Sequence, residues 1–303
     1  MDAAAKKQLM LTACRVRMGI IEGVHSAKSG HPGGSLSCAD ILTYLYFAKM
    51  NIDPKNPKME NRDRFVLSKG HAAPALYSVL ANRGYFDTEL LNTLRKIGSI
   101  LQGHPDMKHI PGVDMSTGSL GQGISAAVGM ALSAKHFGND FKVYTVLGDG
   151  EIEEGQVWEA AMFAANKGLS NLTAFVDYNN LQIDGTIEEV NSAAPIDKKF
   201  EAFNWHTIII DGHDFDQIEA ALNEAETIDK PVVIIAKTVK GKGVSFMENQ
   251  VGWHGSAPND EQYEQAMAEL KATLESLQSG GAEQCQKLKR LLPERHSVTL
   301  LLN

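Results

Sequence analysis

The most informative chemistry-bearing residues in this sequence are an aspartate and an asparagine, Asp149 and Asn179, which lie 30 residues apart. Each follows a short apolar run, and one strand-helix-strand unit takes about 30 residues. The spacing therefore predicts that both side chains lie at the carboxyl ends of successive parallel strands, at one edge of a sheet. A carboxylate and an amide oxygen there suit Mg²⁺, which prefers oxygen ligands and usually shares them with phosphates.

The residues around this pair favour a bound diphosphate. Gly148 and Gly150 flank Asp149, and glycine lets the backbone approach a ligand closely. A helix predicted soon after them would direct N–H groups and the positive end of its dipole toward an anion. Taken alone, Gly-Asp-Gly is more often an ordinary turn and Asn179-Asn180 an ordinary loop, but the two together at this spacing favour a site.

The strands that must position these residues are short, apolar and rich in β-branched side chains. Polar residues and glycines follow most of them, so the predicted site lies at one edge of the sheet. The predicted strands are residues 64–67, 143–147, 172–176, 207–210 and 231–236.

Helical patterns separate the strands. Leu9 to Ile20 has apolar residues at helical spacing, and the glycine-rich run 30–34 should break this helix. Ser37 and Asp40 resemble a capping box that opens a helix from residue 38 to about 50. Strands alternating with helices predict an α/β fold, a parallel sheet with helices on both faces. Further helices are predicted over residues 72–82, 155–167 and 215–227.

Length and composition narrow the class of protein. The chain has 303 residues and a formal net charge of −8, so binding to nucleic acid through phosphate contacts is disfavoured. Three cysteines without a CxxC pair argue against a disulfide framework or zinc site. We expect no membrane span, no secretory signal and a cytoplasmic location. Residues 1–278 are predicted to form one domain, and 279–303 a tail that is disordered or foreign to the native gene.

Ten histidines and one basic loop are further candidates for site residues. His31, His71, His104 and His254 lie beside glycine or proline in predicted loops, where functional side chains concentrate. His213 follows a strand and precedes a helix, which favours a helix-start turn over a ligand role. The loop Lys240–Gly243 fits a phosphate-binding loop and a solvated basic turn equally well.

Beyond these features, the sequence resembles the transketolase family over roughly residues 8–277. The shared motifs occur in family order and include Gly148-Asp149-Gly150 with Asn179-Asn180. The resemblance implies a thiamine-diphosphate-binding fold and covers only the diphosphate-binding domain, so we expect the N-terminal subunit of a split transketolase. The other matching blocks are residues 29–34, 64–71, 103–105, 116–123, 183–185 and 253–255.

The resemblance implies specific roles. Asp149, Asn179 and the backbone carbonyl of Leu181 would coordinate Mg²⁺ or another divalent cation such as Ca²⁺ or Mn²⁺. Gly150 and His254 would contact the diphosphate of thiamine diphosphate. Catalytic roles are implied for His31, His71, His104 and His254. Cofactor-binding roles are implied for His71, His104, Gly118, Ser119, Leu120, Asp149, Gly150, Glu154, Asn179, Leu181 and His254, with Glu154 as an acid near the subunit interface.

The implied reaction is transfer of a two-carbon ketol unit from a ketose phosphate to an aldose phosphate, in the pentose phosphate pathway. The family's pyrimidine-binding domain supplies a glutamate across a dimer interface, so we expect a C-terminal partner subunit, two copies of each chain, and no useful turnover by this chain alone. A deoxyxylulose-phosphate-synthase-like fragment and a non-catalytic thiamine-diphosphate-binding subunit remain alternatives. A NAD-dependent dehydrogenase is disfavoured because no GxGxxG follows the first strand.

Overall fold

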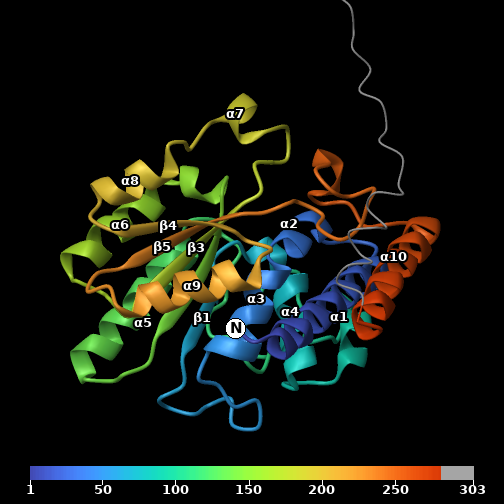
Figure 1. The fold of residues 1–303 in the computed structure, drawn as a ribbon, viewed down its shortest axis with the longest axis horizontal. Helices are drawn as coiled ribbons and strands as arrows, with labels where there is room; N and C mark the ends of the chain where they lie inside the picture. The colour runs from blue at the N-terminus through green and yellow to red at the C-terminus, as the bar shows by residue number, and fades with distance from the viewer. Residues whose placement is uncertain (281–303) are drawn as a thin grey trace, which may run out of the picture.

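The fold is built on one parallel β-sheet with strand order β1-β2-β3-β5-β4 (Figure 1), and the computed structural model describes residues 1–280. All neighbouring strands pair in parallel. The predicted fold class and all five predicted strands are confirmed. The strands are β1 (Arg64–Leu67), β2 (Val143–Gly148), β3 (Leu172–Tyr178), β4 (His206–Asp211) and β5 (Val232–Lys237).

Helices cover both faces of the sheet, because successive strand side chains point to opposite sides. In β3, Ala174 and Val176 face one apolar cluster and Phe175 faces the other. The first face packs against α5 (Gln122–Phe137), α6 (Gly155–Asn166) and α8 (Ile196–Ala202). The second packs against α1 (Ala3–Ala27), α2 (Pro32–Ser37), α3 (Ala39–Tyr44), α4 (Ala73–Arg83), α9 (Phe215–Glu226) and α10 (Asp260–Gln278). Shorter elements are η1 (Leu45–Lys49), η2 (Gly70–Ala72), η3 (Thr88–Thr93), η4 (Glu151–Glu153), α7 (Ile187–Val190) and η5 (Val251–Trp253).

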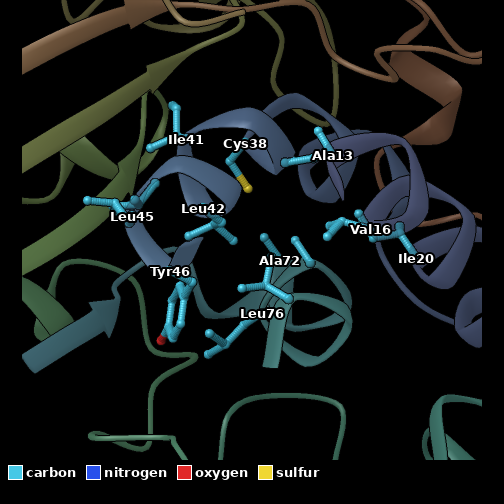
Figure 2. Close-up of a cluster of buried hydrophobic side chains, with 14 of the residues drawn as sticks. Ala13, Val16, Ile20, Cys38, Ile41, Leu42, Leu45, Tyr46, Ala72 and Leu76 are labelled. Carbon is cyan, nitrogen blue, oxygen red and sulfur yellow. The ribbon is translucent and has the colours of Figure 1, made fainter. Parts of the chain in front are cut away.

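The larger cluster centres on α1, whose apolar face the sequence predicted. Val16 and Ile20 have no exposed surface and point toward α3 and α4, as Figure 2 shows. Leu42 and Leu76 enclose them from the other side. Each fully buried side chain of this kind contributes about 1.5–3 kcal/mol through removal of apolar surface from water. The packing fixes α2 and α3 beneath the carboxyl edge of the sheet.

The predicted capping box at Ser37 is wrong. Residues 32–37 form α2, so the glycine-rich run ends one helix and carries another, with Pro32 at its first position. The Ser37 hydroxyl points into the core and donates to Asp177 Oδ2 at 2.5 Å. Gly33 is required here by close packing, because a Cβ would lie 2.7 Å from the Trp253 carbonyl oxygen. A short helix with two glycines therefore forms through tertiary contacts that override propensity.

The remaining predicted helices agree with the structure to within a few residues at their ends. The described residues contain four further helices, α5, α7, α8 and α10. Within residues 1–280, no helix is both long and apolar enough to cross a membrane. The predicted tail, 279–303, lies outside the described residues from position 281 onward.

Candidate active site

The carboxyl edge of the sheet opens into a cleft of about 340 Å³. Segments that follow β1, β2, β3 and β5 line it, together with residues at the start of α2. Parallel strands deliver their following loops to one edge, so segments far apart in sequence meet there. The cleft brings together most of the predicted site residues, namely His31, His71, Gly118, Leu120, Asp149, Gly150, Asn179, Leu181 and His254.

Asp149 and Asn179 lie side by side, as their spacing predicted. Strands β2 and β3 are neighbours, with Gly148 opposite Asp177, so the residues just beyond them are adjacent as well. Asp149 Oδ2 accepts the Asn180 N–H at 2.6 Å, which links the two loops directly. The Asn179 side-chain oxygen accepts the Leu181 N–H at 3.2 Å. The Asp149 carboxylate and the Asn179 side-chain oxygen thus form a compact group of oxygens in the cleft, and the turn after β3 holds them together.

The surroundings of the Asp149 carboxyl disfavour its ionised form. It is 3 % exposed, and burial followed by repulsion from Asp177 raises its pKa to about 7. The Lys69 ammonium and two backbone N–H groups oppose this rise without cancelling it. A divalent cation beside the carboxylate would favour the charged form and lower this pKa. The carboxylate is therefore suited to hold a cation at neutral pH.

Lys240 is a buried residue of the cleft, so the interpretation of its loop as a solvated basic turn is wrong. The residue is 1 % exposed. Its Nζ lies 3.1 Å from the Leu181 carbonyl oxygen and 2.9 Å from His254 Nδ1. Burial, reinforced by the nearby Lys69, lowers its pKa to about 8. The ammonium group holds the carbonyl predicted as a cation ligand and adds positive charge at the diphosphate end of the predicted site.

A buried ion pair at the cleft, between the lining residue Lys69 and Asp177 behind it, was not predicted from the sequence. Lys69 Nζ donates to Asp177 and, at 2.9 Å, to the Gly34 carbonyl oxygen. Asp177 also accepts from Ser37 and Thr238. The network joins α2 to the ends of β1, β3 and β5, all of which carry residues of the cleft. Lys69 could have been suspected from its place just after a strand, but nothing in the pattern pairs it with Asp177.

Three predicted histidines form a cluster at one wall of the cleft. The ring of His31 lies 5.3 Å from that of His71 and 5.6 Å from that of His254, and the His71 and His254 rings are 5.3 Å apart. Burial lowers the pKa of His31 to about 4, that of His254 to about 3, and that of His71 well below its usual value. The imidazoles are therefore neutral at pH 7 and can accept or donate hydrogen bonds. Among residues 1–280, His31 Nδ1 is a buried atom with no hydrogen-bond partner.

Three predicted site residues lie outside the lining of this cleft. His104 is exposed and packs on Gly118, where a Cβ would lie 2.9 Å from its ring. Ser119 is exposed beside Gly118. Glu154 is exposed at the N-terminus of α6, with its Cβ against Gly121. The structure therefore places His104 and Ser119 near the rim and Glu154 beyond it.

The loop after β3 supplies lining residues that the sequence did not single out. Gln182 packs over Gly150 and donates to Glu153, tying this loop to the one after β2. Asn191 Nδ2 donates to the same carboxylate at 3.0 Å. Further lining residues to which the sequence analysis gave no individual role are Gly34, Lys69, Glu151, Ile183 and Asp184.

Comparison with known proteins adds the family. Residues 7–276 match the family described as "Transketolase, thiamine diphosphate binding domain". The chain belongs to the transketolase family. It is 49% identical over 259 residues to a 6-deoxy-6-sulfo-D-fructose transketolase subunit of Clostridium sp., covering 84% of this chain and 94% of that protein. It is 44% identical to one of the subunits of apulose-4-phosphate transketolase from Phocaeicola vulgatus, covering 89% of this chain and 96% of the relative.

Solved structures agree with this assignment. Transketolase from Leishmania mexicana superposes with a TM-score of 0.83 at 29% identity, covering 93% of this chain. The match covers 46% of that protein, so the chain spans about half the length of this transketolase. The predicted family and thiamine-diphosphate-binding fold are confirmed. The chain corresponds to the N-terminal subunit of a transketolase, and the deoxyxylulose-phosphate-synthase alternative is not favoured.

Proposed function

We propose that this chain binds thiamine diphosphate through a divalent cation and, together with a C-terminal partner, transfers a two-carbon ketol unit from a ketose phosphate to an aldose phosphate. The observation that carries the proposal is the grouping of Asp149, Asn179, Lys240 and three neutral histidines in one cleft. The names of the two relatives support it, since both are named as parts of a transketolase.

The residues of the cleft fit the metal and the cofactor. Asp149 is a buried carboxylate with a raised pKa, which a cation would relieve. Asn179 and the Leu181 carbonyl add oxygens beside it, the donor type that Mg²⁺ and Ca²⁺ prefer. Lys240 and His254 lie next to this group and would hold diphosphate oxygens. We therefore assign the cation to the first three residues and the diphosphate to the last two with Gly150.

Bound thiamine diphosphate supplies the electron sink for breaking and forming the carbon–carbon bond. The protein's contribution is to bind, orient and move protons. His31, His71 and His254 form a neutral wall at the cleft, so they can donate to or accept from a sugar hydroxyl or carbonyl oxygen. We assign the catalytic role to these three and to His104 at the rim. The cofactor-border role goes to Gly118, Ser119 and Leu120, and the interface role to Glu154.

A partner chain would complete the site. Ser119, Leu120 and Glu154 present exposed surface at or near the cleft. We propose that a C-terminal transketolase subunit with a pyrimidine-binding domain covers this region, two copies of each chain forming the enzyme. Among the described residues, Cys14 and Cys38 are free buried thiols, which suits the proposed cytoplasmic setting. We propose that the ketol transfer belongs to the pentose phosphate pathway.

Reconstitution tests the proposal. The purified chain should show no ketol transfer from ketose phosphates to aldose phosphates, and addition of the C-terminal subunit with thiamine diphosphate and Mg²⁺ should restore it. Asp149→Ala should abolish Mg²⁺-dependent cofactor binding by the reconstituted complex, measured by titration calorimetry. Glu188→Ala, at an exposed residue of α7, is the matched control. Unchanged cofactor affinity in Asp149→Ala, or robust transfer by the chain alone, would refute the model.

A further inference from the structure

We propose that His213 is a positioning residue for the diphosphate end of the cleft, where it fixes the backbone next to Lys240. The inference rests on the proposed function, because it concerns how strongly this chain holds the cofactor. His213 does not line the cleft. It lies in the turn between β4 and α9, as the sequence predicted, and it acts through a loop that does line the cleft.

The two ring nitrogens of His213 have different partners. Nε2 accepts the backbone N–H of Val239 at 2.9 Å, and Nδ1 lies 2.7 Å from Asp40 Oδ2. Because Nε2 must offer its lone pair to an N–H donor, the proton resides on Nδ1 and is donated to Asp40. The imidazole therefore bridges a fixed carboxylate and the main chain of the loop after β5. A side chain without an acceptor at the Nε2 position would leave the Val239 N–H unpaired.

Asp40 is itself held rigidly. Arg17 reaches it from α1 through two parallel bonds, Nη1 to Oδ1 at 2.9 Å and Nη2 to Oδ2 at 2.5 Å. The same guanidinium donates from Nε to the Lys242 carbonyl oxygen at 3.1 Å. The side chains of Arg17 and Asp40 are 10% and 8% exposed. A rigid, largely buried pair of this kind is a firm anchor, since a bidentate arginine–carboxylate contact fixes orientation as well as distance.

Hydrogen bonds to His213 and Arg17, both bound to Asp40, hold the loop on either side of Lys240. Val239 is held by His213, and Lys242 is held by Arg17. Lys240 lies between them, and its extended side chain reaches the Leu181 carbonyl and His254. The anchor residues Arg17 and Asp40 belong to α1 and α3, and His213 lies just before α9. These three helices pack on one another (Figure 1). Three distant parts of the chain thus set the position of one ammonium group.

Other bonds fix the loop on both sides of Val239, whereas His213 holds the Val239 N–H itself. Before Val239, Thr238 donates its N–H to the Tyr178 carbonyl oxygen at 3.0 Å and its hydroxyl to Asp177. The Val239 carbonyl oxygen accepts the Lys242 N–H at 3.2 Å. The Gly241 N–H donates to the Gly33 carbonyl at 3.0 Å, and the Lys240 carbonyl accepts from Asn249 at 2.9 Å. Both bonds lie at or after Lys240. Loss of the His213 bond should therefore leave the Val239 N–H unpaired and allow this one peptide to turn, which would carry the Lys240 side chain away from the Leu181 carbonyl. The bonds of Thr238 and Gly241 should keep the rest of the loop folded.

Two amide substitutions separate the bonds of His213. His213→Gln extends to the Nε2 position and keeps an acceptor for Val239, whereas His213→Asn is shorter and keeps only a donor for Asp40. In the complex reconstituted with its C-terminal subunit, His213→Asn should weaken affinity for thiamine diphosphate with Mg²⁺ about tenfold, the effect expected for loss of an outer supporting contact. His213→Gln should restore most of it. At saturating cofactor both should keep kcat close to the parent value.

A double-mutant cycle with Lys240→Met tests whether His213 acts through Lys240. His213→Asn should cause no further loss of affinity when Lys240 is already Met. Equal affinities of the Asn and Gln variants, or an undiminished loss in the Lys240→Met background, would overturn the proposal. Thermal unfolding of each complex checks that both amide variants fold.

A crystal structure of His213→Asn gives a readout that needs no cofactor. It should show Lys240 Nζ displaced from the Leu181 carbonyl and from His254. An unmoved Lys240 overturns the positioning role even if the complex binds thiamine diphosphate. Conversely, a parent complex that binds no cofactor refutes the proposed function, while a displaced Lys240 would still support the positioning role.

Discussion

Replacement of Asp149 by asparagine should stabilise the metal-free chain increasingly as pH rises. The pKa of this carboxyl is about 7, against an ordinary value of 3.8, because of burial and the neighbouring Asp177. In the unfolded chain the group is ionised throughout pH 5 to 8. In the folded chain it is protonated at pH 5 and ionised at pH 8. A group whose folded pKa is raised contributes stability below its unfolded pKa, and that stability is lost as pH rises through the folded pKa.

The magnitude follows from the gap between pH 5 and the folded pKa. Over these two pH units the folded state binds about one more proton than the unfolded state, which at 1.36 kcal/mol per unit amounts to about 2.7 kcal/mol. The asparagine side chain does not ionise, so the variant does not lose this stability as pH rises. It offers one acceptor oxygen in place of two to the N–H groups of Gly150 and Asn180, at a pH-independent cost of about 1 kcal/mol. Relative to the parent, the free energy of unfolding of the variant should therefore rise by about 2.7 kcal/mol between pH 5 and pH 8. The pH-independent cost of the substitution does not change this difference.

Urea unfolding of both full-length chains in EDTA, followed by circular dichroism at pH 5 and pH 8, measures this difference. The histidines with lowered pKa titrate in both proteins, so their contribution cancels in the comparison. If the difference in free energy of unfolding between the two chains stays constant with pH to within about 0.5 kcal/mol, the raised pKa of the buried Asp149 carboxyl is refuted. The same variant should lose Mg²⁺-dependent cofactor binding in the reconstituted complex, so the stabilising change is also the one that removes the site.

Four further outcomes are expected. Gly118→Ala should lower the free energy of unfolding by about 1–3 kcal/mol in denaturant titrations, because Gly118 has φ +141° and a Cβ would meet the His104 ring. His104→Ala should reduce turnover while calorimetric cofactor affinity stays nearly intact; a collapse of affinity would place His104 among the cofactor ligands. Lys69→Met should destabilise the chain by about 3–5 kcal/mol by leaving Asp177 buried without its partner, and near-parent stability would contradict the ion pair. Cofactor affinity of the complex should fall as pH rises through about 8, where Lys240 loses its proton, and Lys240→Met should remove that component of the pH profile.

The sequence determined the sheet and the central pair of the site. Each strand could be recognised from its own β-branched residues, and the 30-residue spacing of Asp149 and Asn179 sets them at neighbouring strand ends. The prediction from this spacing depends on the strand-helix-strand unit that joins these two residues, because the length and hand of such a unit are nearly fixed. The positions of His31, His71 and His254 in glycine-bordered loops also pointed correctly to the cleft.

Only the tertiary structure decided which polar residues pair beneath the site. Strand β5 inserts between β3 and β4, which brings the loop with Lys240 beside the Leu181 carbonyl. Lys69 meets Asp177, and His213 meets Asp40, across more than 100 residues in each case. Strand order and helix packing create these contacts, and a local pattern of residue types carries no information about which distant segment will lie beside it. Burial then makes the pairing obligatory, because a charge removed from water is tolerated only with a partner.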